Sequence, residues 1–303
     1  MKIYKLFFVL LLILSNSDFF YGQANLLNAV VPQEIGQLNE QQLATSDNEP
    51  LPYGYVDDRD VMWSKTIWEK IDLDERINFP YYYPVENVDP TRKPLFDVLV
   101  EGVRDGSITE IYNDGYFRDK KTLDQVEESL YLRQMTDQGA DKLNAGEELT
   151  EEDYTTTRVT AYDIKAYRIK GTWYFDKRLG ELKYRLLGIA PISPDVNFIK
   201  EYQENKTPDE NQDFVELFWV WFPDARKSLN DAEIFNSRNA SQPITFDLML
   251  NSRRFNAIIY KEENPYNDRE IKEYIYEDAL RQLLESERIK NVIRDYEQDM
   301  WNN

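Results

Sequence analysis

The most regular spacing of metal-type ligands in this chain is Asp209-Glu210-Asn211-Gln212-Asp213, which has the D-x-N-x-D start of a calcium-binding loop. An EF-hand loop also needs a glycine at its sixth position and a glutamate at its twelfth, because its turn is sharp and its last ligand is bidentate. Those two positions hold Phe214 and Val220. The pattern therefore fails as a calcium site, a polar lead-in to a strand explains it better, and no metal-binding residue is predicted.

Two missing residue types narrow the catalytic chemistry further, since the chain has no His and no Cys. Serine–histidine and cysteine–histidine nucleophile pairs, imidazole bases and zinc fingers are excluded. Two opposed carboxylates can hydrolyse a glycosidic bond, but among 56 Asp and Glu residues such a pair arises by chance. We assign no catalytic or cofactor-binding residue and predict a protein that is not an enzyme.

The charge of the chain bears on its partners. With 36 Lys and Arg against 56 Asp and Glu, the net charge is −20. Such a surface repels nucleic-acid phosphates and anionic lipid head groups, and no basic stripe interrupts it. We therefore predict no nucleic-acid partner and no binding to a membrane surface through charge, which leaves basic proteins and cations as compatible partners.

Aromatic clusters are the better candidates for function. The segment Phe79-Pro80-Tyr81-Tyr82-Tyr83-Pro84 is predicted to be extended, because its prolines restrict the backbone, and neighbouring side chains of an extended segment cannot all enter one core. Tyr and Trp are enriched at protein interfaces. Packing within the core is the competing explanation for each ring. The candidate interface residues are Tyr81, Tyr82, Tyr83, Trp63, Trp68, Trp219 and Trp221.

The N-terminus predicts export. Lys2 and Lys5 precede a nine-residue apolar run over 6–14, which is too short to cross a bilayer and typical of a signal peptide. Small residues that suit a cleavage site follow, so we expect a signal peptide over 1–24 and then a soluble exported chain. Residues 25–56 show no sustained period and are predicted to form an extended arm or linker.

The rest of the chain predicts two domains joined by an acidic linker. Residues 57–136 are expected to form a mostly helical N-terminal domain, with helices over 61–71, 95–103 and 122–135. Residues 137–153 contain seven acids and one Lys, so 137–156 is interpreted as a solvated linker, with a cation or partner loop as the alternative.

Residues 157–303 are expected to form the C-terminal domain. Three β-rich segments, over 157–169, 172–176 and 181–189, predict an antiparallel meander, with turns at Lys170-Gly171 and at 176–180. A helix is predicted near the C-terminus, over about 268–300. The fold class is therefore α+β, with helical segments and a small antiparallel meander.

Two segments of the chain, which we call the echo segments, have weakly similar sequences and suggest two related helix–strand units. Pro94-Leu95-Phe96-Asp97-Val98-Leu99-Val100 is similar to Ile244-Thr245-Phe246-Asp247-Leu248-Met249-Leu250, and each is followed by an Ile-Tyr pair, at 111–112 and 259–260. A duplication would explain the match, and coincidence in so short a segment is the alternative.

Several longer motifs resemble the gliding-motility protein family GldN, called PorN where the cells do not glide. The matching stretches include Trp68-Glu69-Lys70-Ile71-Asp72-Leu73, Asn78-Phe79-Pro80-Tyr81-Tyr82-Tyr83-Pro84, Gly171-Thr172-Trp173-Tyr174-Phe175-Asp176-Lys177, Leu187-Gly188-Ile189-Ala190-Pro191 and Phe218-Trp219-Val220-Trp221-Phe222-Pro223-Asp224-Ala225-Arg226. Together with the echo segments they cover most of the chain from about residue 57 onward.

The resemblance implies a non-enzymatic structural subunit of the type IX secretion and gliding machinery of Bacteroidetes, located in the periplasm. It implies self-association in a ring with an outer-membrane lipoprotein, GldK/PorK, beside a motor subunit of the GldM/PorM type. The family offers no catalytic residues to carry over. The alternative function is a periplasmic carbohydrate-binding module or a carboxylate-dependent glycoside hydrolase.

Overall fold

The computed structural model describes residues 49–86, 92–146, 148, 150–199, 214–234, 244–276 and 278–301, all within one compact unit. The predicted signal peptide, the arm up to residue 48 and the D-x-N-x-D segment at 209–213 lie outside the described residues. Within this part of the chain, helices and an antiparallel sheet are both present, which confirms the α+β class.

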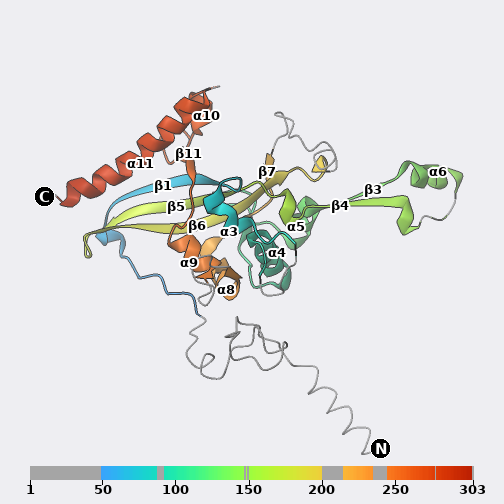
Figure 1. The fold of residues 1–303 in the computed structure, drawn as a ribbon, viewed down its shortest axis with the longest axis horizontal. Helices are drawn as coiled ribbons and strands as arrows, with labels where there is room; N and C mark the ends of the chain where they lie inside the picture. Colours follow the sequence, from blue (N-terminus) through green and yellow to red (C-terminus); the bar gives the residue numbers. More distant parts are fainter. Residues whose placement is uncertain are drawn as a thin grey trace, which may run out of the picture. The chain divides into compact units, whose positions relative to one another are not determined.

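The main sheet is antiparallel and has the strand order β11-β1-β5-β6-β8-β2, with β7 paired to β6 (Figure 1). Its strands are β1 (Val61–Asp72), β2 (Ile111–Tyr112), β5 (Ala166–Asp176), β6 (Glu181–Pro194), β7 (Phe214–Glu216), β8 (Trp219–Trp221) and β11 (Ile258–Glu262). The β5–β6 hairpin, turning at 177–180, confirms the core of the predicted meander.

The predicted turn at Lys170-Gly171 is wrong, because β5 continues through it with a bulge opposite β6. Gly171 is needed here for space. A Cβ on this residue would lie 2.1 Å from the hydroxyl oxygen of Tyr184, which occupies the position of the missing side chain.

The predicted helix over 61–71 is also wrong, since these residues form β1. The apolar positions Trp63, Ile67 and Ile71 recur every four residues, a spacing that fits both a helix and the alternate positions of a strand. Pairing decides the outcome: β1 is hydrogen-bonded to β5 along almost its whole length and to β11 on its other side. The segments predicted as two domains therefore share one sheet.

Four helices gather in one layer beside the sheet (Figure 1): α3 (Phe79–Tyr82), α4 (Leu95–Asp105), α8 (Phe222–Asp231) and α9 (Phe246–Asn251). The predicted helix at 95–103 is confirmed in α4, which ends at Gly106 in the left-handed conformation. The extended geometry predicted for Phe79–Pro84 is wrong over Phe79–Tyr82, because a proline in the first helical turn loses no hydrogen bond, whereas Tyr83 is extended.

The predicted acidic linker is instead part of a two-stranded hairpin. Helix α5 (Leu123–Leu130) has the expected Thr122–Gln125 capping box, but it ends where β3 (Tyr131–Met135) begins, so the predicted helix to residue 135 is too long. Strand β3 pairs only with β4 (Tyr154–Arg158), and α6 (Asp137–Ala145) lies between them. We call residues 131–158 the hairpin arm; Figure 1 shows it extending from the sheet.

The C-terminal residues are helical, as predicted, in α10 (Ile271–Tyr274) and α11 (Ala279–Trp301). Helix α11 packs on β11, and its Tyr296 stacks on Trp63 of β1 with ring centroids 4.6 Å apart. The remaining elements are the pair β9 (Glu233–Ile234) and β10 (Ile244–Thr245), and short 3₁₀ turns at Asp58–Asp60, Arg76–Asn78, Glu151–Asp153 and Ala161–Asp163.

Both echo segments form a helix followed by a strand: α4 leads to β2, and α9 leads to β11. The two units are also connected reciprocally. Strand β1, which precedes the first helix, pairs with β11, while β8, which precedes the second helix, pairs with β2. The β5–β6 hairpin lies between these two pairs, so the two helix–strand segments form the two outer parts of the sheet.

A buried ion pair connects helices α8 and α9. Arg226 of α8 makes two hydrogen bonds to Asp247 of α9, at 2.8 and 2.9 Å, and both side chains are at most 10% exposed. Arg226 also donates to the carbonyl of Leu51 at 2.6 Å, and its guanidinium lies 4.1 Å from the ring of Tyr53. This contact holds the described end of the N-terminal arm on the helices.

Replacing Asp247 by Ala should therefore destabilise the protein strongly. The change leaves the Arg226 guanidinium buried without its carboxylate, which typically lowers the free energy of unfolding by about 3–5 kcal/mol. Urea denaturation measures this loss. The matched control is Glu287→Ala, which breaks the exposed pair with Lys290 on α11 and should cost less than about 1 kcal/mol. Equal losses in the two variants would contradict a special role for the buried pair.

Candidate interaction surfaces

A single line of side chains crosses one face of the sheet. Residues opposite one another on paired strands share a face, and the successive partners here are Lys261, Trp68, Lys170, Gly188 and Trp221. The ammonium groups of Lys170 and Lys261 lie 4.7 and 4.8 Å from the ring of Trp68. We call this line the cation–aromatic row. Each such contact contributes about 0.5–2 kcal/mol, depending on how far water is excluded.

Phe117 packs over this row where Gly188 leaves space. A Cβ on Gly188 would lie 2.4 Å from the Phe117 ring. That ring meets Tyr112, Trp219 and Trp221 edge-on, with centroids 5.4, 6.2 and 4.8 Å away. Phe117 has a φ of 58°, in the left-handed region that a Phe side chain rarely adopts. The surrounding rings therefore hold an unfavourable backbone conformation in place.

The side chains of this row are covered or hydrogen-bonded by other groups of the same chain. Trp68 and Trp219 are 3% and 1% exposed. Lys170 donates to the carbonyl of Gly115 at 2.9 Å, and burial lowers the pKa of its ammonium group. Lys261 donates to the hydroxyl of Tyr116 at 2.7 Å. These groups stabilise the sheet, and only the half-buried Trp221 among the three tryptophans is partly accessible.

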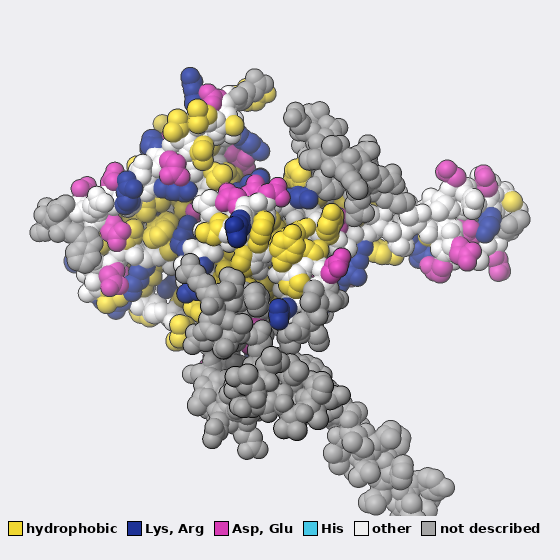
Figure 2. Space-filling model, viewed as in Figure 1, with side chains coloured by type: hydrophobic (Ala, Val, Ile, Leu, Met, Phe, Trp, Pro, Cys, Tyr) yellow, Lys and Arg dark blue, Asp and Glu magenta, His cyan; other side chains and the backbone are white. Residues whose placement is uncertain are grey.

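A second aromatic cluster, around α3, is exposed. Phe79, Tyr83, Tyr162 and Ile77 are 37%, 54%, 60% and 57% exposed. The ring of Tyr83 lies edge-on to Phe79 and Tyr82, at centroid distances of 5.6 and 4.9 Å, and the Tyr82 hydroxyl donates to the carbonyl of Tyr162 at 3.3 Å. We call these five residues the tyrosine patch. Figure 2 shows hydrophobic side chains exposed near the middle of the viewed face, in the region of α3.

Tyr81 and Trp63 complete the predicted candidates, and neither belongs to the patch. Tyr81 is fully buried, and its hydroxyl donates to the carbonyl of Arg254 at 3.3 Å. Burial raises the pKa of this hydroxyl. Trp63 is half-buried against Tyr296. The three consecutive tyrosines thus have different environments, and Tyr83 is the most exposed of them.

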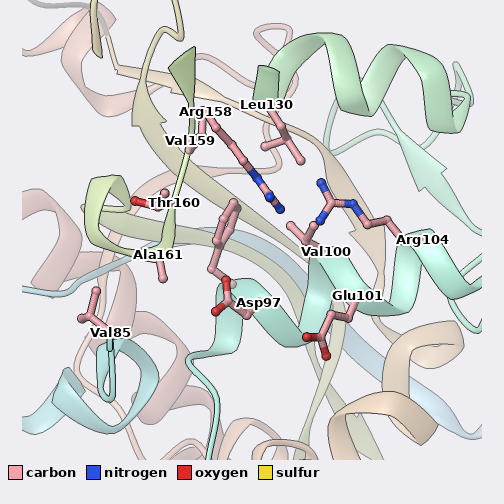
Figure 3. A pocket seen from close by; sticks show the side chains of 11 residues that line it. Val85, Asp97, Val100, Glu101, Arg104, Leu130, Arg158, Val159, Thr160 and Ala161 are labelled. Carbon is pink, nitrogen blue, oxygen red and sulfur yellow. The ribbon is translucent and has the colours of Figure 1, made fainter. Parts of the chain in front are cut away.

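A cavity of about 320 Å³ opens between α4 and the start of the hairpin arm (Figure 3). We call it the base pocket. Its apolar lining consists of Val85, Phe96, Val100, Leu130, Val159 and Ala161, and its polar lining of Asp97, Glu101, Arg104, Arg158 and Thr160. Figure 3 shows the side chains of Arg104 and Arg158 reaching toward the same part of the cavity, while the carboxylate of Glu101 points away from them.

The two guanidinium groups of the base pocket differ in their partners. Arg104 donates to both oxygens of Glu127, at 2.6 and 3.1 Å. Arg158 makes no ion pair or side-chain hydrogen bond within the described ranges. Burial, and then the negative charge of Glu101, raise the pKa of Asp97. The positive charge of Arg158 partly offsets this rise and also helps to lower the pKa of Glu127, so both guanidinium groups of the pocket have carboxylates nearby.

The far end of the hairpin arm is acidic, and hydrogen bonds and an ion pair within it hold it together. Asp153 is buried and bonds to Lys142 at 2.7 Å and to the amide and hydroxyl of Thr150 at 2.7 and 2.9 Å. Its carbonyl accepts from Thr136, the residue that caps α6. The hydrogen bond from Lys142 and those from Thr150 lower the pKa of the Asp153 carboxyl to about 2. One carboxylate thus fastens the helix to the returning chain.

Sequence patterns indicated some of these surfaces and missed others. The aromatic run at 79–84 leads to the tyrosine patch, but its distant member Tyr162 carries no signal of its own. The basic residues interleaved in the β-rich segments include Lys170 and Arg158. Lys170 becomes enclosed by rings, whereas Arg158 lines a cavity. This difference depends on which strands pair, and strand pairing is not visible in the local sequence.

The chain was compared with known proteins. A family model described as gliding motility associated protein GldN matches residues 56–302. The chain belongs to the GldN family. A search of curated proteins found no match. Membership makes this GldN protein a component of the gliding motility and type IX secretion machinery.

Two further observations concern membranes and metals. None of the described helices of this GldN protein is both long and apolar enough to cross a membrane. Within the residues that the structure describes, no three carboxylates come together as a metal site.

Acid should loosen the end of the hairpin arm before the sheet unfolds. The Asp153 pKa is about 2 when folded and about 3.9 in an unfolded chain. Its stabilising contribution is therefore complete above about pH 4 and is lost as the pH falls toward 2. The protection of the Gly139 amide against hydrogen exchange, measured relative to an unstructured peptide at the same pH, should fall across this range. Asp153→Asn should show fast exchange already at neutral pH, whereas the exposed neighbour substitution Glu152→Gln should leave the wild-type pH profile unchanged.

Proposed function

We propose that this GldN protein is a non-enzymatic structural subunit that works in the periplasm. It assembles with itself and with an outer-membrane lipoprotein of the GldK/PorK type into a ring, beside a motor subunit of the GldM/PorM type. The ring holds the secretion and gliding machinery together through protein contacts. The tyrosine patch is the observation that carries this proposal.

The patch has the properties of an anchoring surface. The ring of Tyr83 lies edge-on to those of Phe79 and Tyr82, so these three rings have little side-chain freedom left to lose when a partner covers them. Burying one large apolar side chain contributes about 1.5–3 kcal/mol. Phe79, Tyr83 and Tyr162 are 37–60% exposed, so each can still contribute part of this amount, and aromatic anchors dominate many interfaces. In a chain with a net charge of −20, an apolar contact also avoids bringing like charges together.

The alternative, a glycoside hydrolase or carbohydrate-binding module, finds no support in the base pocket. Its two carboxylates, Asp97 and Glu101, are four residues apart on α4 and therefore lie side by side on one helix face. Glycoside hydrolysis needs carboxylates on opposite sides of the sugar. Neither Trp nor Tyr is among the residues lining this cavity.

The proposal predicts a heavy particle. When the full chain is co-expressed with its lipoprotein partner and purified, light scattering should give a mass far above that of a one-to-one pair. A stable mixture of separate monomers at micromolar concentrations would contradict it.

Tyr83→Ser combined with Tyr162→Ser should weaken binding to the lipoprotein partner without unfolding the chain, because both rings are exposed. A loss of about 2 kcal/mol, typical of an aromatic anchor, raises the Kd by about thirtyfold. The Kd for binding to the surface-immobilised lipoprotein partner measures this change. The matched control replaces Tyr266 and Tyr276, which are 67% and 78% exposed outside the patch. Equal binding by the two double variants would rule the patch out as the contact.

A further inference from the structure

We propose that two copies of this chain pair through the outer face of α11, with the two helices antiparallel about a two-fold axis. The occupant of this face is therefore the same face of a second copy. The inference rests on the proposed function in that it assigns a surface to self-association, but the contact itself needs neither the ring nor the lipoprotein. Two exposed leucines and a row of charges that is complementary to itself carry the inference.

Helix α11 has apolar residues on two sides. On its inner side, Ile289 and Ile293 are buried against the sheet. On its outer side, Leu280 and Leu284 are 67% and 59% exposed. These two leucines are four residues apart and are therefore neighbours on the helix surface. Figure 1 shows α11 apart from the layer formed by α3, α4, α8 and α9. An apolar stripe on a helix normally faces a packing partner, and the described part of the chain leaves this one exposed.

Four alternating charges lie beside the leucines on the same helix. Leu284 is three residues after the second of these charges and four residues before the last, so it is next to both on the helix surface. Within one copy, the row forms two ion pairs, with closest distances of 3.0 and 2.7 Å. We call these residues the charge row: Asp278, Arg281, Glu285 and Arg288.

The basic members of the charge row are the more accessible ones. The side chains of Arg281 and Arg288 are 77% and 55% exposed, against 39% for Asp278 and 18% for Glu285. Glu285 also accepts a hydrogen bond from the hydroxyl of Tyr274 at 3.2 Å. An ionised carboxylate offers about four acceptor positions, so each acid can keep its own arginine and receive a second one from outside.

The charge row is complementary to a reversed copy of itself. Its members are separated by three, four and three residues, which reads the same in both directions, whereas the signs of the charges exchange. In an antiparallel pair centred on residue 283, Asp278 meets Arg288 of the other copy, and Arg281 meets Glu285 of the other copy. The two-fold axis repeats both pairs, as in any isologous contact. Ion pairs within one helix explain alternating charges, but they do not explain the exposed leucines beside them.

The local charge permits this contact in a strongly negative chain. Residues 278–290 contain three acids and three bases, whereas the whole chain has a net charge of −20. The third acid, Glu287, pairs with Lys290 of the same helix at 3.0 Å. Two copies that meet through this neutral segment avoid the like-charge repulsion of their acidic surfaces. The outer face of α11 is therefore suited to a second copy of the chain.

The contact is small and closed. Two leucines from each copy and ion pairs that remain partly exposed contribute modestly, so we expect a weak dimer with a Kd in the micromolar to millimolar range. A self-complementary contact stops at two copies. Growth of a ring beyond this pair therefore uses another surface. The tyrosine patch shares no residue with the outer face of α11, so the two contacts do not compete for the same side chains.

Two charge swaps separate pairing between copies from pairing within one helix. Arg281→Glu with Glu285→Arg keeps opposite charges between the copies but places like charges together within each helix. Glu285→Arg with Arg288→Glu does the reverse. Sedimentation equilibrium of the purified chain should give a dimer Kd close to the wild-type value for the first variant. The second variant should raise the Kd by about tenfold or more, because like charges now meet across the axis.

The two swaps are matched controls for each other. Both conserve the net charge, and both replace the mostly buried Glu285 and remove its bond with Tyr274. Thermal unfolding followed by circular dichroism shows whether each variant folds. If the second variant dimerises like the wild type, or if the first loses the dimer while it remains folded, the charge row does not pair between copies and the inference is wrong.

A single cysteine tests the position of the axis. The chain has no native Cys, and residue 284 is one position from the proposed centre, so its two copies are offset by only about 3 Å along the helix direction. Mild oxidation of Leu284→Cys should therefore give a covalent dimer. Asp295→Cys is the matched control, because its side chain is 63% exposed and it lies three turns further along the same side of α11. Its two copies would be about 36 Å apart, far beyond disulfide reach.

These experiments use the purified chain alone and are therefore independent of the test of the proposed function. A chain that stays monomeric at its highest soluble concentration, or equal disulfide yields from the two cysteine variants, overturns the pairing through α11 and leaves the ring proposal intact. If the α11 dimer forms but no heavy particle appears with the lipoprotein partner, the proposed function is wrong and the contact stands.

Discussion

The pairing of β1 with β5 is the interaction on which the rest of this structure depends. It places Trp68 opposite Lys170 and brings residues from before the acidic segment into the same sheet as those after it. Because side chains alternate between the faces of a strand, a slip of one residue would move every side chain of β1 to the opposite face. Trp68 would then leave the lysines on both its sides, and Glu69 would leave the buried pair that it makes with Arg253.

The reciprocal connection of the two helix–strand units follows from this pairing. Strand β1 precedes the first helix and pairs with β11, which follows the second helix. Strand β8 precedes the second helix and pairs with β2, which follows the first. Neither outer part of the sheet therefore forms from one unit alone. The β5–β6 hairpin joins the two parts and contributes the longest strand, β6. Stability is thus shared along the chain, and the hairpin arm is left as an appendage that pairs only with itself.

Local signals in the sequence were enough for elements whose determinants are local. The capping box at Thr122, the helix from Leu95 to its left-handed glycine and the hairpin turn before Glu181 were predictable because neighbouring residues define them. Strand β1 was not, since a four-residue spacing fits both periods and only the strands of another segment decide between them. The candidate interface residues show the same division. Their aromatic character was visible, but whether a ring lies under Phe117 or in water is set by the register of the sheet.

The sheet edges also explain why contacts between copies should use side chains. An exposed edge strand offers unpaired backbone groups to any other chain, and short strands limit that risk. Here the edge strand β2 has two residues, and β11 is bordered by α11 and by the bridge between Lys261 and Glu270. Backbone pairing between copies through the main sheet is therefore restricted. The chain instead presents an exposed cluster of rings around α3, a cavity beside α4 and the acidic end of the hairpin arm. Surfaces of this kind select their partners by shape and charge.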